Sequence, residues 1–598
     1  SEWALAGTNS KRDSVAKEDR QRIMDALRDI RVLDPAVGSG AFPMGILHKI
    51  LSLFERLEPS FDPYEKKLSI LRKNIYGVDI DPTAIEICRL RAWLSIIVDV
   101  KDIKKIKPLP NLDFKFVCAN SLIGLEKGQA SFTTDEKLKP ELIRIRDEYY
   151  ATSSKLKKDK FQKQYTKLTH KETLFDTEET RQLKSYRPFE NGRGTSFYDP
   201  ELMHGVNLFD VIIGNPPYGA SLKGLSRDAV VKSLGKVPDY EVYYYFIELA
   251  KMLLLNNGVN SYILPNTFLF NVFASEYRKN ILENWHINTL IDCTAFKLFD
   301  SATVYNAITV FTKSKDSRIV GYKNTLGAKN FNDLLCRETL YITKDNLLLN
   351  NTNWGLAFKL SPMILGVISK IKLSREKVSG VFPEISQGLI AYDKYTGQDK
   401  EIIKNRSFHH FEKINESTKE WLWGGDITPY QVKWNGQEFV DYGAAIANPR
   451  SPKYFKGDRI LVREITNPKV YAAFTDKELY HDPALIVILD NRESTLLLLG
   501  ILNSKLATFY HFNASPKATK GAFPKILVKD IKEFPFPLIG DKEQSEIASQ
   551  IESFVRNILD VKKADPKAST REMESQIDTL VYKLYGLNEE EVKVIEGK

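Results

Sequence analysis

The sequence has 598 residues, of which 43% are hydrophobic and 27% are charged. This length corresponds to about three to four domains at roughly 100–200 residues each. The composition excludes fibrous and wholly disordered classes. No apolar run approaches the ~18 residues of a membrane span, and charges near the start argue against a signal peptide. A net charge of +9 permits a nucleic-acid partner without requiring one.

Four cysteines occur singly along the chain, at Cys88, Cys118, Cys293 and Cys336. Because the sequence contains no Cys-x-x-Cys pair, it offers no zinc-ribbon or redox motif, and we expect no metal. We interpret these residues as small thiols in a reducing compartment, and we therefore expect a cytoplasmic protein. The first residue is not Met, which leaves open a processed start, a recombinant start and a fragment of a longer chain.

Residues 30–325 alternate apolar runs with amphipathic helical patterns. Asp81 and Pro82 have the residue types of a helix N-cap and a first helical position. The alternation predicts an α/β fold with a Rossmann-like, doubly wound parallel sheet. Strands are predicted at residues 30–33, 75–80, 114–118 and 209–213, and helices at residues 46–57 and 85–97.

Changes in composition mark further segments. The first domain is predicted to cover residues 1–328, with a linker at 329–359. Residues 125–205 within it are polar and Lys-rich, and they fit either an inserted, solvated helical hairpin or an arm that contacts phosphates. Residues 360–540 are predicted to form a second, mixed α/β domain. Helical periodicity returns at residues 541–598.

A glycine-containing turn, VLDPAVGSGAF at residues 32–42, follows the first predicted strand. Glycines there allow the backbone to approach a ligand closely, and the following helix offers free N–H groups. Pro43 stands where the dinucleotide fingerprint requires Gly, so the turn is not that motif. Neither Gly-Lys pair in the chain belongs to a phosphate loop, so ATP-driven translocation is unsupported.

Two further strand ends carry polar side chains. Asp79 ends the second predicted strand, in YGVDID, where a carboxylate can accept both hydroxyls of a ribose. A turn or N-cap aspartate is the alternative. Asn120, in CANS after the third strand, offers the donor and acceptor that an adenine edge requires. An ordinary turn asparagine is equally compatible with that sequence.

The fourth predicted strand continues into FDVIIGNPPYG, residues 209–219. Pro216 and Pro217 lack backbone donors and fix φ, which predicts a rigid turn with exposed carbonyls. With the three motifs before it, this turn resembles that of the amino-methyltransferases that use S-adenosylmethionine. The motif order resembles the TaqI-type adenine-N6 DNA methyltransferases, above all the methylase part of type IIG restriction–modification enzymes. Relatives also occur in BREX phage-defence systems.

The resemblance implies a role for each matching residue. Asp79 would hold the ribose hydroxyls of S-adenosylmethionine, and Ile80 would pack on the adenine of that cofactor. Asn120 stands where many relatives have Asp, which keeps a contact with the adenine amine and removes a charge. The other implied cofactor-binding residues are Asp34, Ala36, Gly38 and Gly40, and the implied catalytic residues are Asn215, Pro216, Pro217, Tyr218 and Phe299.

An exocyclic adenine amine is a poor nucleophile because its lone pair is delocalised into the ring. The side-chain carbonyl of Asn215 and the backbone carbonyl of Pro216 could accept its N–H groups and stabilise the positive charge that develops as the methyl arrives. The target base would be flipped out of the duplex and stacked between Tyr218 and Phe299, although Phe299 also fits an ordinary core position. No proline precedes a cysteine, which argues against cytosine-C5 methylation. Cytosine N4 is a closer rival, but relatives that act there more often carry Ser in place of Asn215.

Residues 360–540 resemble the TaqI-type target-recognition domain, so we expect double-stranded DNA as the partner. Within it, residues 513–529 contain lysines and no acidic residue, as expected of a loop that contacts phosphates; a plain solvated loop is the alternative. A suitably spaced nuclease motif is not found, and we expect an endonuclease fused upstream in a longer parent or acting as a separate partner. The lysines of this loop are Lys517, Lys520, Lys525 and Lys529.

The leading interpretation is therefore a site-specific DNA adenine-N6 methyltransferase of restriction–modification or phage defence. Methylation of RNA or of a protein glutamine is one alternative, because an Asn-Pro-Pro-Tyr turn can also hold an amide. A non-catalytic DNA specificity subunit is the other alternative, and the intact residues 215–218 argue against it.

Overall fold

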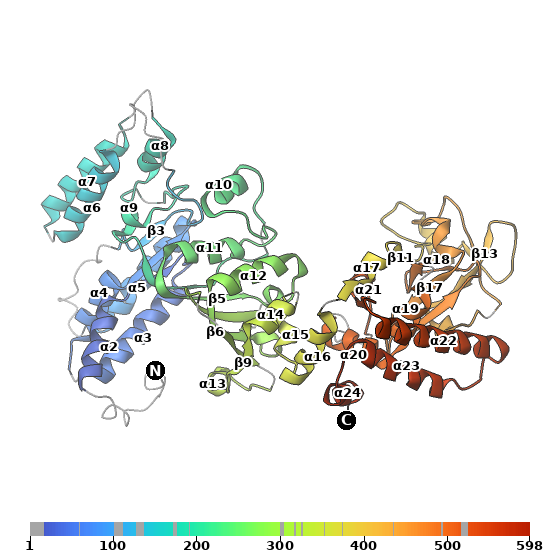
Figure 1. Cartoon of the computed structure of the whole chain (residues 1–598). Helices are drawn as coiled ribbons and strands as arrows, with labels where there is room; N and C mark the ends of the chain where they lie inside the picture. The colour runs from blue at the N-terminus through green and yellow to red at the C-terminus, as the bar shows by residue number, and fades with distance from the viewer. Residues whose placement is uncertain are drawn as a thin grey trace. The chain divides into compact units, whose positions relative to one another are not determined.

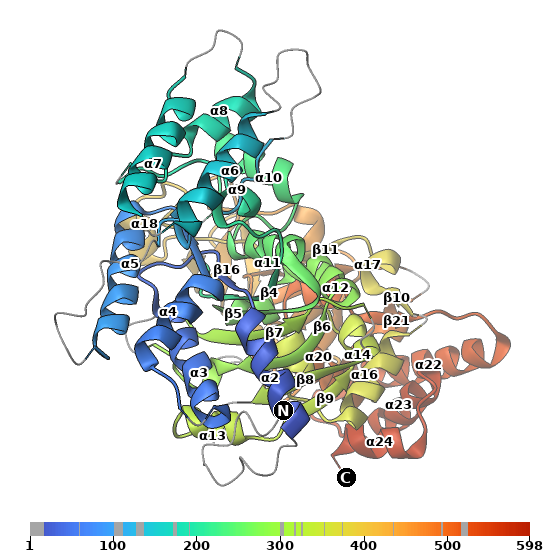
Figure 2. The same cartoon turned by 90° about the vertical axis from the view of Figure 1, so that its left-hand side faces the viewer.

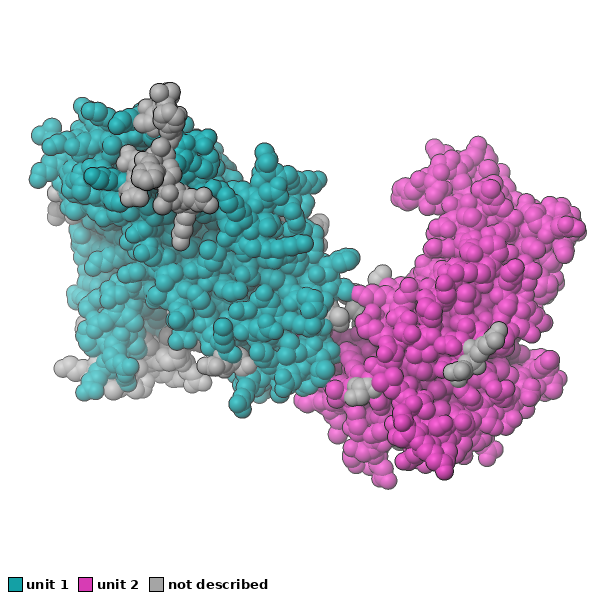
Figure 3. Space-filling model, turned by 45° about the horizontal axis from the view of Figure 1, so that its top comes forward, with its two compact units in different colours: residues 1–352 teal, residues 353–598 magenta. Residues whose placement is uncertain are grey.

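The structure is a computed structural model, and it separates into two compact units, Ser1–Thr352 and Asn353–Lys598 (Figure 3). The described residues are 17–58, 60–100, 112–126, 137–152, 154–171, 176–190, 192–219, 221–299, 304–315, 318–324, 327–351, 353–373, 375–434, 436–491, 494–515 and 524–597. Within these ranges, no helix is both long enough and apolar enough to cross a membrane.

Unit 1 is built on a nine-stranded sheet with the order β3-β2-β1-β4-β5-β7-β6-β8-β9 (Figure 1). Neighbours from β3 to β5 pair in parallel, β7 runs antiparallel between β5 and β6, and β9 is antiparallel to β8. The predicted doubly wound parallel sheet is therefore confirmed. Its strands are β1 (Val32–Asp34), β2 (Ile75–Asp79), β3 (Phe116–Cys118), β4 (Phe209–Gly214), β5 (Leu254–Pro265), β6 (His286–Asp292), β7 (Asn306–Thr312), β8 (Ile319–Asn324) and β9 (Leu340–Thr343).

Helices provide the crossovers that parallel strands require. The helix α5 begins as predicted, because Asp81 is its N-cap, with its side chain accepting from Thr83 N, and Pro82 is its first residue. The helices of unit 1 are α2 (Lys17–Asp29), α3 (Ala41–Leu57), α4 (Pro63–Lys73), α5 (Pro82–Ile97), α6 (Leu138–Ala151), α7 (Lys155–Thr169), α8 (Glu178–Ser185), α9 (Pro200–His204), α10 (Gly224–Leu234), α11 (Tyr243–Leu253), α12 (Ser275–Asn284), α13 (Phe331–Cys336) and α14 (Lys344–Leu349).

The segment between β3 and β4 contains a helical hairpin, α6 and α7, which lie side by side in both views (Figures 1 and 2). The hairpin is anchored by aromatic contacts: the rings of Tyr149 and Tyr165 lie 4.8 Å and 5.6 Å from that of Phe189, which in turn lies 5.8 Å from the ring of Phe114 beside β3. Such edge-to-face and tilted pairs stabilise packing beyond the apolar area that they bury. The insertion is therefore packed on the domain through a core of its own.

Residues 329–359, which were expected to form a linker, contain helices and a strand instead. They include α13 and β9, and β9 is the edge strand of the unit 1 sheet, paired with β8. Alternating apolar residues at Leu340 and Ile342 fit a strand, but the run is short and flanked by polar residues, which hid it in the sequence. The boundary between the units falls at residues 352 and 353.

Unit 2 begins with small helices and two four-stranded sheets, ordered β11-β20-β17-β18 and β12-β16-β13-β19. Its strands are β10 (Arg375–Lys377), β11 (Ile385–Gln387), β12 (His409–His410), β13 (Thr418–Leu422), β14 (Ile427–Thr428), β15 (Gln431–Val432), β16 (Phe439–Asp441), β17 (Arg459–Arg463), β18 (Ala472–Thr475), β19 (Tyr480–His481), β20 (Leu485–Leu489) and β21 (Pro535–Pro537). Its helices are α15 (Trp354–Ala357), α16 (Pro362–Lys372), α17 (Val378–Val381), α18 (Lys400–Asn405), α19 (Thr495–Asn503), α20 (Lys505–Ala514), α21 (Val528–Lys532), α22 (Lys542–Ala564), α23 (Arg571–Leu584) and α24 (Glu589–Glu596).

The C-terminal helices predicted from residue 541 onward are present and belong to the core of unit 2. The helix α22 packs closely on α19, because a Cβ built on Gly500 would lie 2.8 Å from the side chain of Ile551 and 3.1 Å from that of Val555. The glycine thus permits the close approach of the two helices. These helices, with the sheet that contains β17 and β20, form one apolar cluster.

Candidate methyl-transfer site

Four of the predicted site residues lie at the same edge of the unit 1 sheet. Asp34 ends β1 and Asp79 ends β2, while Asn120 and Asn215 follow the last residues of β3 and β4. The strands β3, β2, β1 and β4 are consecutive neighbours and run parallel, so their carboxyl ends share one edge. Ligands of open α/β sheets bind outside the carboxyl ends of the strands. The topology therefore brings the four motifs together.

The glycine turn after β1 is held against β2 by two hydrogen bonds, one accepted by the backbone of β2 and one by a side chain. Val37 N donates to Val78 O at 2.9 Å, and Gly38 N donates to Asp79 Oδ2 at 2.7 Å. Gly38 has φ +50, and a Cβ built there would meet no atom within 4 Å, so its Cβ side faces open space. Gly40 has φ +86, and its Cβ would lie 2.7 Å from Cys88 Sγ. The turn thus combines left-handed backbone with close packing, which favours glycine at both positions.

Asp34 is buried at the base of this turn. Its Oδ1 accepts from Ala36 N at 3.1 Å, whereas Oδ2 is buried and has no hydrogen-bond partner among the described residues. Burial, assisted by the nearby Asp79 carboxylate, raises the pKa of Asp34 to about 8. A cationic ligand group beside Oδ2 would favour the charged carboxylate.

The strand that leads into Asn-Pro-Pro-Tyr is packed directly against Asp34. A Cβ built on Gly214 would lie 2.6 Å from Asp34 Oδ1, closer than real Cβ contacts allow. Gly214 is the last residue of β4 and precedes Asn215. The close approach couples the glycine turn of β1 to the proline turn of β4.

Asp79 and Ile80, at the end of β2, offer hydrogen-bond acceptors and an exposed apolar side chain. The two oxygens of Asp79 each accept one backbone N–H, from Gly38 at 2.7 Å and from Asp81 at 2.9 Å. A carboxylate oxygen can accept more than one hydrogen bond, so hydroxyl donors could still be received. Ile80 is 68% exposed, which leaves an apolar surface for a flat ring.

Asn120 is held by the end of the insertion, a feature that the sequence did not indicate. Asn120 N donates to Thr195 O at 3.0 Å, and Thr195 N donates to Cys118 O at 3.1 Å, so residues near 195 continue the sheet beyond β3. Asn120 Oδ1 accepts from Leu122 N at 3.1 Å, which directs the amide through a local turn. A Cβ on Gly194 would lie 2.8 Å from Cys118 Sγ, so this position favours glycine. In the sequence, the Gly-Arg-Gly run at residues 192–194 could have indicated such a close approach of two segments.

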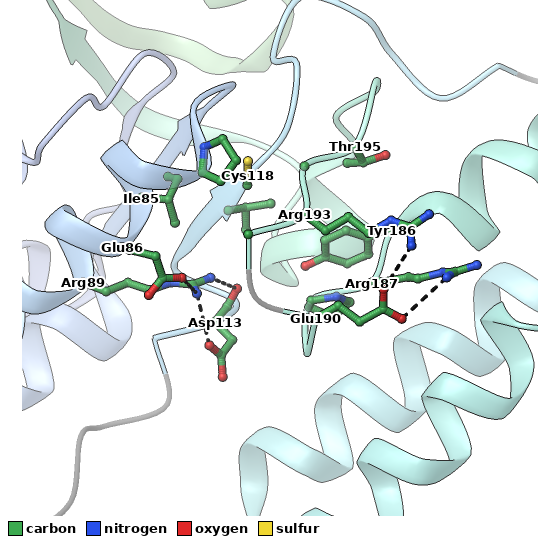
Figure 4. Close-up of a pocket in the computed structure, with 15 residues that line it drawn as sticks. Ile85, Glu86, Arg89, Asp113, Cys118, Tyr186, Arg187, Glu190, Arg193 and Thr195 are labelled. Carbon is green, nitrogen blue, oxygen red and sulfur yellow. Dashed lines mark hydrogen bonds and ion pairs between the residues drawn. The ribbon is translucent and has the colours of Figure 1, made fainter.

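Figure 4 shows this junction between β3 and the insertion. A small cavity of about 30 Å³ lies there, with Cys118 on one side and Tyr186 and Thr195 on the other. Arg89 donates to Phe116 O at 2.7 Å and forms an ion pair with Asp113 at 3.5 Å, which fixes α5 to the start of β3. Such a cavity has room for about one water molecule, so we regard the junction as structural.

The Asn-Pro-Pro-Tyr turn leaves its key acceptor without a partner. Asn215 Oδ1 is buried and makes no hydrogen bond with any described residue. Pro216 is buried, Pro217 is exposed and Tyr218 is half-buried. Glu241 holds the far side of the turn, because its Oε2 accepts from Gly219 N at 2.8 Å. A buried acceptor without a partner is a position that a ligand donor can satisfy.

The remaining predicted residues are less closely tied to this edge. Phe299 lies in the loop between β6 and β7 and is half-buried. In unit 2, Lys525 forms an ion pair with Glu464 at 2.9 Å, and Lys529 is exposed on α21. Lys517 and Lys520 lie outside the described residues. The roles of these five residues remain predictions.

Metal chemistry finds no support in the part of the chain that the structure describes, which holds no group of three or more His, Cys, Asp or Glu side chains suited to an ion. The four cysteines are free thiols. Burial raises the pKa of Cys88 and of Cys293 to about 12, and that of Cys118 to about 11, so these thiols are poor nucleophiles.

The chain combines two regions that match known families. Residues 73–299 match the Eco57I restriction-modification methylase, and residues 419–536 match the TaqI-like C-terminal specificity domain. The first region includes the carboxyl ends of β2, β3 and β4 with Asp79, Asn120 and Asn215, and it begins after β1 and its glycine turn; the second covers most of the strands of unit 2. The resemblance expected from the motifs is therefore confirmed, and the chain is related to type II restriction–modification enzymes.

Individual relatives are likewise restriction enzymes or methyltransferases by name. A putative type II restriction enzyme and methyltransferase of Methanocaldococcus jannaschii is 26% identical, over 98% of this chain and 55% of its own length. The type II restriction enzyme and methyltransferase RM.Eco57I of Escherichia coli is 24% identical, over 63% of this chain and 35% of its own. The type II methyltransferase M.BstVI of Geobacillus stearothermophilus is 24% identical, over 47% of this chain and 54% of its own.

The chain thus spans between about a third and just over half of the length of these relatives. Among solved structures, the type IIL restriction–modification enzyme MmeI in complex with DNA aligns with 97% of this chain and 74% of its own, at 13% identity and a TM-score of 0.49.

Proposed function

We propose that the chain is a site-specific DNA methyltransferase that transfers a methyl group from S-adenosylmethionine to the N6 amine of adenine, in restriction–modification or phage defence. The observation that carries the proposal is the buried, unpartnered Oδ1 of Asn215 at the sheet edge that also presents Asp34 and Asp79. The match of residues 73–299 to a restriction–modification methylase supports the same chemistry.

The residues at this edge fit a cationic nucleoside cofactor. Asp34 offers a buried carboxylate oxygen with no partner among the described atoms, suited to a positively charged methionine end. Gly38 leaves open space above the turn, and Asp79 and Ile80 supply hydroxyl acceptors and an apolar platform. We therefore assign cofactor binding to Asp34, Ala36, Gly38, Gly40, Asp79, Ile80 and Asn120. When bound, S-adenosylmethionine supplies an activated methyl group on a sulfonium, so neither a metal nor a covalent enzyme intermediate is required.

The proline turn contributes acceptors and position. Asn215 Oδ1 and the carbonyl of Pro216 would each accept an N–H of the target amine, which draws nitrogen electron density toward the incoming methyl and stabilises the developing positive charge. Because Pro216 and Pro217 fix φ, the acceptors are held in place before the substrate arrives. The hydrogen bond from Gly219 N to Glu241 holds the end of the turn.

Site selection would belong to unit 2. Its residues 419–536 match a specificity domain, and we infer that this region contacts duplex DNA, with Lys517, Lys520, Lys525 and Lys529 near phosphates. A target adenine inside a duplex is out of reach, so it would be flipped out and stacked against Tyr218 and Phe299. The names of two relatives include a restriction enzyme, and we infer that an endonuclease, fused or separate, accompanies this activity.

The test is transfer from isotopically labelled S-adenosylmethionine to mixed-sequence duplex DNA, followed by digestion to nucleosides and mass spectrometry. N6-methyladenine is the expected product. N4-methylcytosine would retain the cofactor site and overturn the base assignment. Parallel reactions with RNA and with a glutamine-containing protein extract provide the competing acceptors, and label in either of these but not in DNA would overturn the substrate class.

A further inference from the structure

A second site lies at the opposite edge of the unit 1 sheet. A cavity of about 580 Å³ opens at the amino ends of β1 to β4, where Arg31, Lys73 and Lys115 come shortly before the first three strands. Its walls are the ends of α2 and α4 and one face of α6, and α4 lies between the other two helices in both views (Figures 1 and 2). The lengths of the strands separate this cavity from Asp34, Asp79 and Asn215.

The lining of the cavity is strongly basic. It includes six Arg or Lys side chains and only two carboxylates, Asp29 and Asp147. Asp147 already pairs with Arg146. The exposed side chains of Arg31, Arg72 and Lys73 have no carboxylate within 4 Å among the described residues. Arg31, Arg72 and Lys73 therefore line one concave space without an ion-pair partner among the described residues, next to the carboxylate of Asp29.

Lys115 forms the buried part of this basic lining. It is only 4% exposed, and its ammonium lies 3.8 Å from the centre of the Tyr76 ring, with no ion pair in the described structure. Burial, assisted by the positive charges of Arg31 and Arg146, lowers the pKa of Lys115 to about 7. A buried cation among like charges is destabilising unless an anion accompanies it.

Hydrogen bonds hold two parts of the cavity wall, Arg146 and the end of α4, in place. The Arg146 guanidinium is fixed by the carbonyls of Glu201 and Leu202, so its charge cannot swing away into solvent. The Tyr76 hydroxyl donates to Lys73 O at 2.9 Å, and the Tyr150 hydroxyl donates to Arg72 O at 3.2 Å, which fixes the end of α4. A preformed pocket loses little conformational entropy when a ligand binds.

We propose that this pocket, defined by Arg31, Arg72, Lys73, Lys115 and Arg146, binds a small, multiply charged polyphosphate anion such as the phosphate chain of a nucleotide. Arg31, Arg72, Lys73 and the buried Lys115 have no carboxylate partner among the described residues, and together they would attract more negative charge than a single carboxylate carries. The volume suits a nucleotide-sized ligand. Duplex DNA with a base at Asn215 would lie at the other edge of the sheet, which favours a free anion over the DNA backbone. The choice of a free anion over the DNA backbone rests on the proposed function, whereas the anion site itself is argued only from the lining of the cavity.

The test uses inorganic tripolyphosphate, titrated into the full chain by calorimetry at about 150 mM salt, where diffuse surface attraction is screened. We expect saturable binding with one site. The double variant Arg72→Glu/Lys73→Glu reverses two exposed charges, and we expect its affinity to fall by about tenfold or more. Lys115→Met tests the buried cation and should cause a comparable loss.

The control is Lys155→Glu/Lys157→Glu, which makes the same charge change on exposed positions of α7 outside the pocket. We expect its affinity for tripolyphosphate to stay within about twofold of the wild-type value. Melting temperature and S-adenosylmethionine binding are measured on all variants to verify the fold. Equal losses in the pocket and control variants, or no loss in the pocket variants, would overturn the proposal.

Two further titrations identify the source of the phosphates. ATP that competes with tripolyphosphate, and binds more tightly than it, would support a nucleotide ligand and a role for the neighbouring Tyr150 ring. Competition by a short DNA duplex, abolished by Arg72→Glu/Lys73→Glu, would instead assign the pocket to the DNA backbone and overturn the small-anion proposal.

Discussion

The two edges of the unit 1 sheet carry opposite chemistry on the same strands. Arg31 precedes β1 and Asp34 ends it, while Lys73 lies two residues before β2 and Asp79 ends it. At the carboxyl edge, unpartnered acceptors await donors and a cation. At the amino edge, Arg31, Arg72 and Lys73 line a cavity and have no ion-pair partner among the described residues. The comparison teaches that one parallel sheet can offer two ligand sites of opposite charge, separated by the length of its strands.

The largest expected effect is at the carboxyl edge, in Asn215→Ala. Removal of the buried acceptor should lower the single-turnover rate of methyl transfer by about 10²–10³-fold, as for other groups that stabilise developing charge. Affinities for S-adenosylmethionine and for DNA should remain near those of the wild type, since Asn215 is proposed to act on the target amine. Rapid-quench assays measure the rate, and calorimetry measures the cofactor affinity. Equal loss of transfer and of cofactor binding would remove Asn215 from the transition state.

Gly214→Ala tests whether the β1 and β4 turns are coupled. The added Cβ would lie 2.6 Å from Asp34 Oδ1, so the carboxylate or the strand must shift. Overpacking of this kind costs about 1–3 kcal/mol of unfolding free energy, and we expect weaker cofactor binding as well. Denaturant titration and calorimetry measure both. The matched control is Gly45→Ala, at an exposed position of α3, where a Cβ meets nothing within 4 Å. A comparable loss of stability and of cofactor affinity in this control would refute the coupling.

The pH dependence of stability tests the burial of Asp34. In the folded protein its pKa is about 8, against an ordinary value of 3.8, so between these values the native state keeps a proton that the unfolded chain has lost. The unfolding free energy should therefore fall as pH rises from 5 to 8, by up to about 1.4 kcal/mol per pH unit from this group. Asp34→Asn should lack that contribution.

Denaturant titrations of both proteins across this pH range, without cofactor, measure the difference. As pH rises, the unfolding free energy of Asp34→Asn should increase relative to that of the wild type. The exposed Asp159→Asn on α7 serves as the control and should follow the wild type. A gap that stays constant from pH 5 to 8 would show that Asp34 is not protonated by burial.

The smallest expected effect concerns Glu241, which accepts from Gly219 N beyond the proline turn. A single hydrogen bond contributes about 0.5–1.5 kcal/mol, so Glu241→Ala should lower the transfer rate by roughly twofold to tenfold through a looser turn. Glu241→Gln keeps an acceptor oxygen and should restore most of the rate. If both variants behaved alike, Glu241 would act through its charge and not through this hydrogen bond.

The carboxyl edge could be predicted from the sequence because each of its motifs is a short continuous run at a strand end. Asp34, Asp79, Asn120 and Asn215 follow apolar runs, and parallel topology then places them together. Helix α5 could be predicted for the same local reason, from Asp81 and Pro82. The confirmed elements are those whose signals lie within a few residues of one another.

The amino edge could not be predicted, because single Arg and Lys residues from distant segments form it. Lys115 is one residue before a three-residue strand, and Arg146 lies on a helix of the insertion. Neither has a motif, and only the tertiary fold brings them together. The pairing of Asn120 with Thr195 and the edge strand β9 could not be predicted either, because both depend on backbone hydrogen bonds between segments that are distant in the sequence.

The central claim is that the carboxyl edge, and not the amino edge, holds S-adenosylmethionine. Calorimetric titration of that cofactor into four proteins tests it most directly: the wild type, Asp79→Ala, Asn215→Ala and Arg72→Glu/Lys73→Glu. The account predicts one site in the wild type, a dissociation constant raised by about tenfold or more in Asp79→Ala, where two charge-assisted contacts are lost, and near-wild-type binding in the other two. Unchanged binding in Asp79→Ala, or loss of binding confined to Arg72→Glu/Lys73→Glu, would contradict the account.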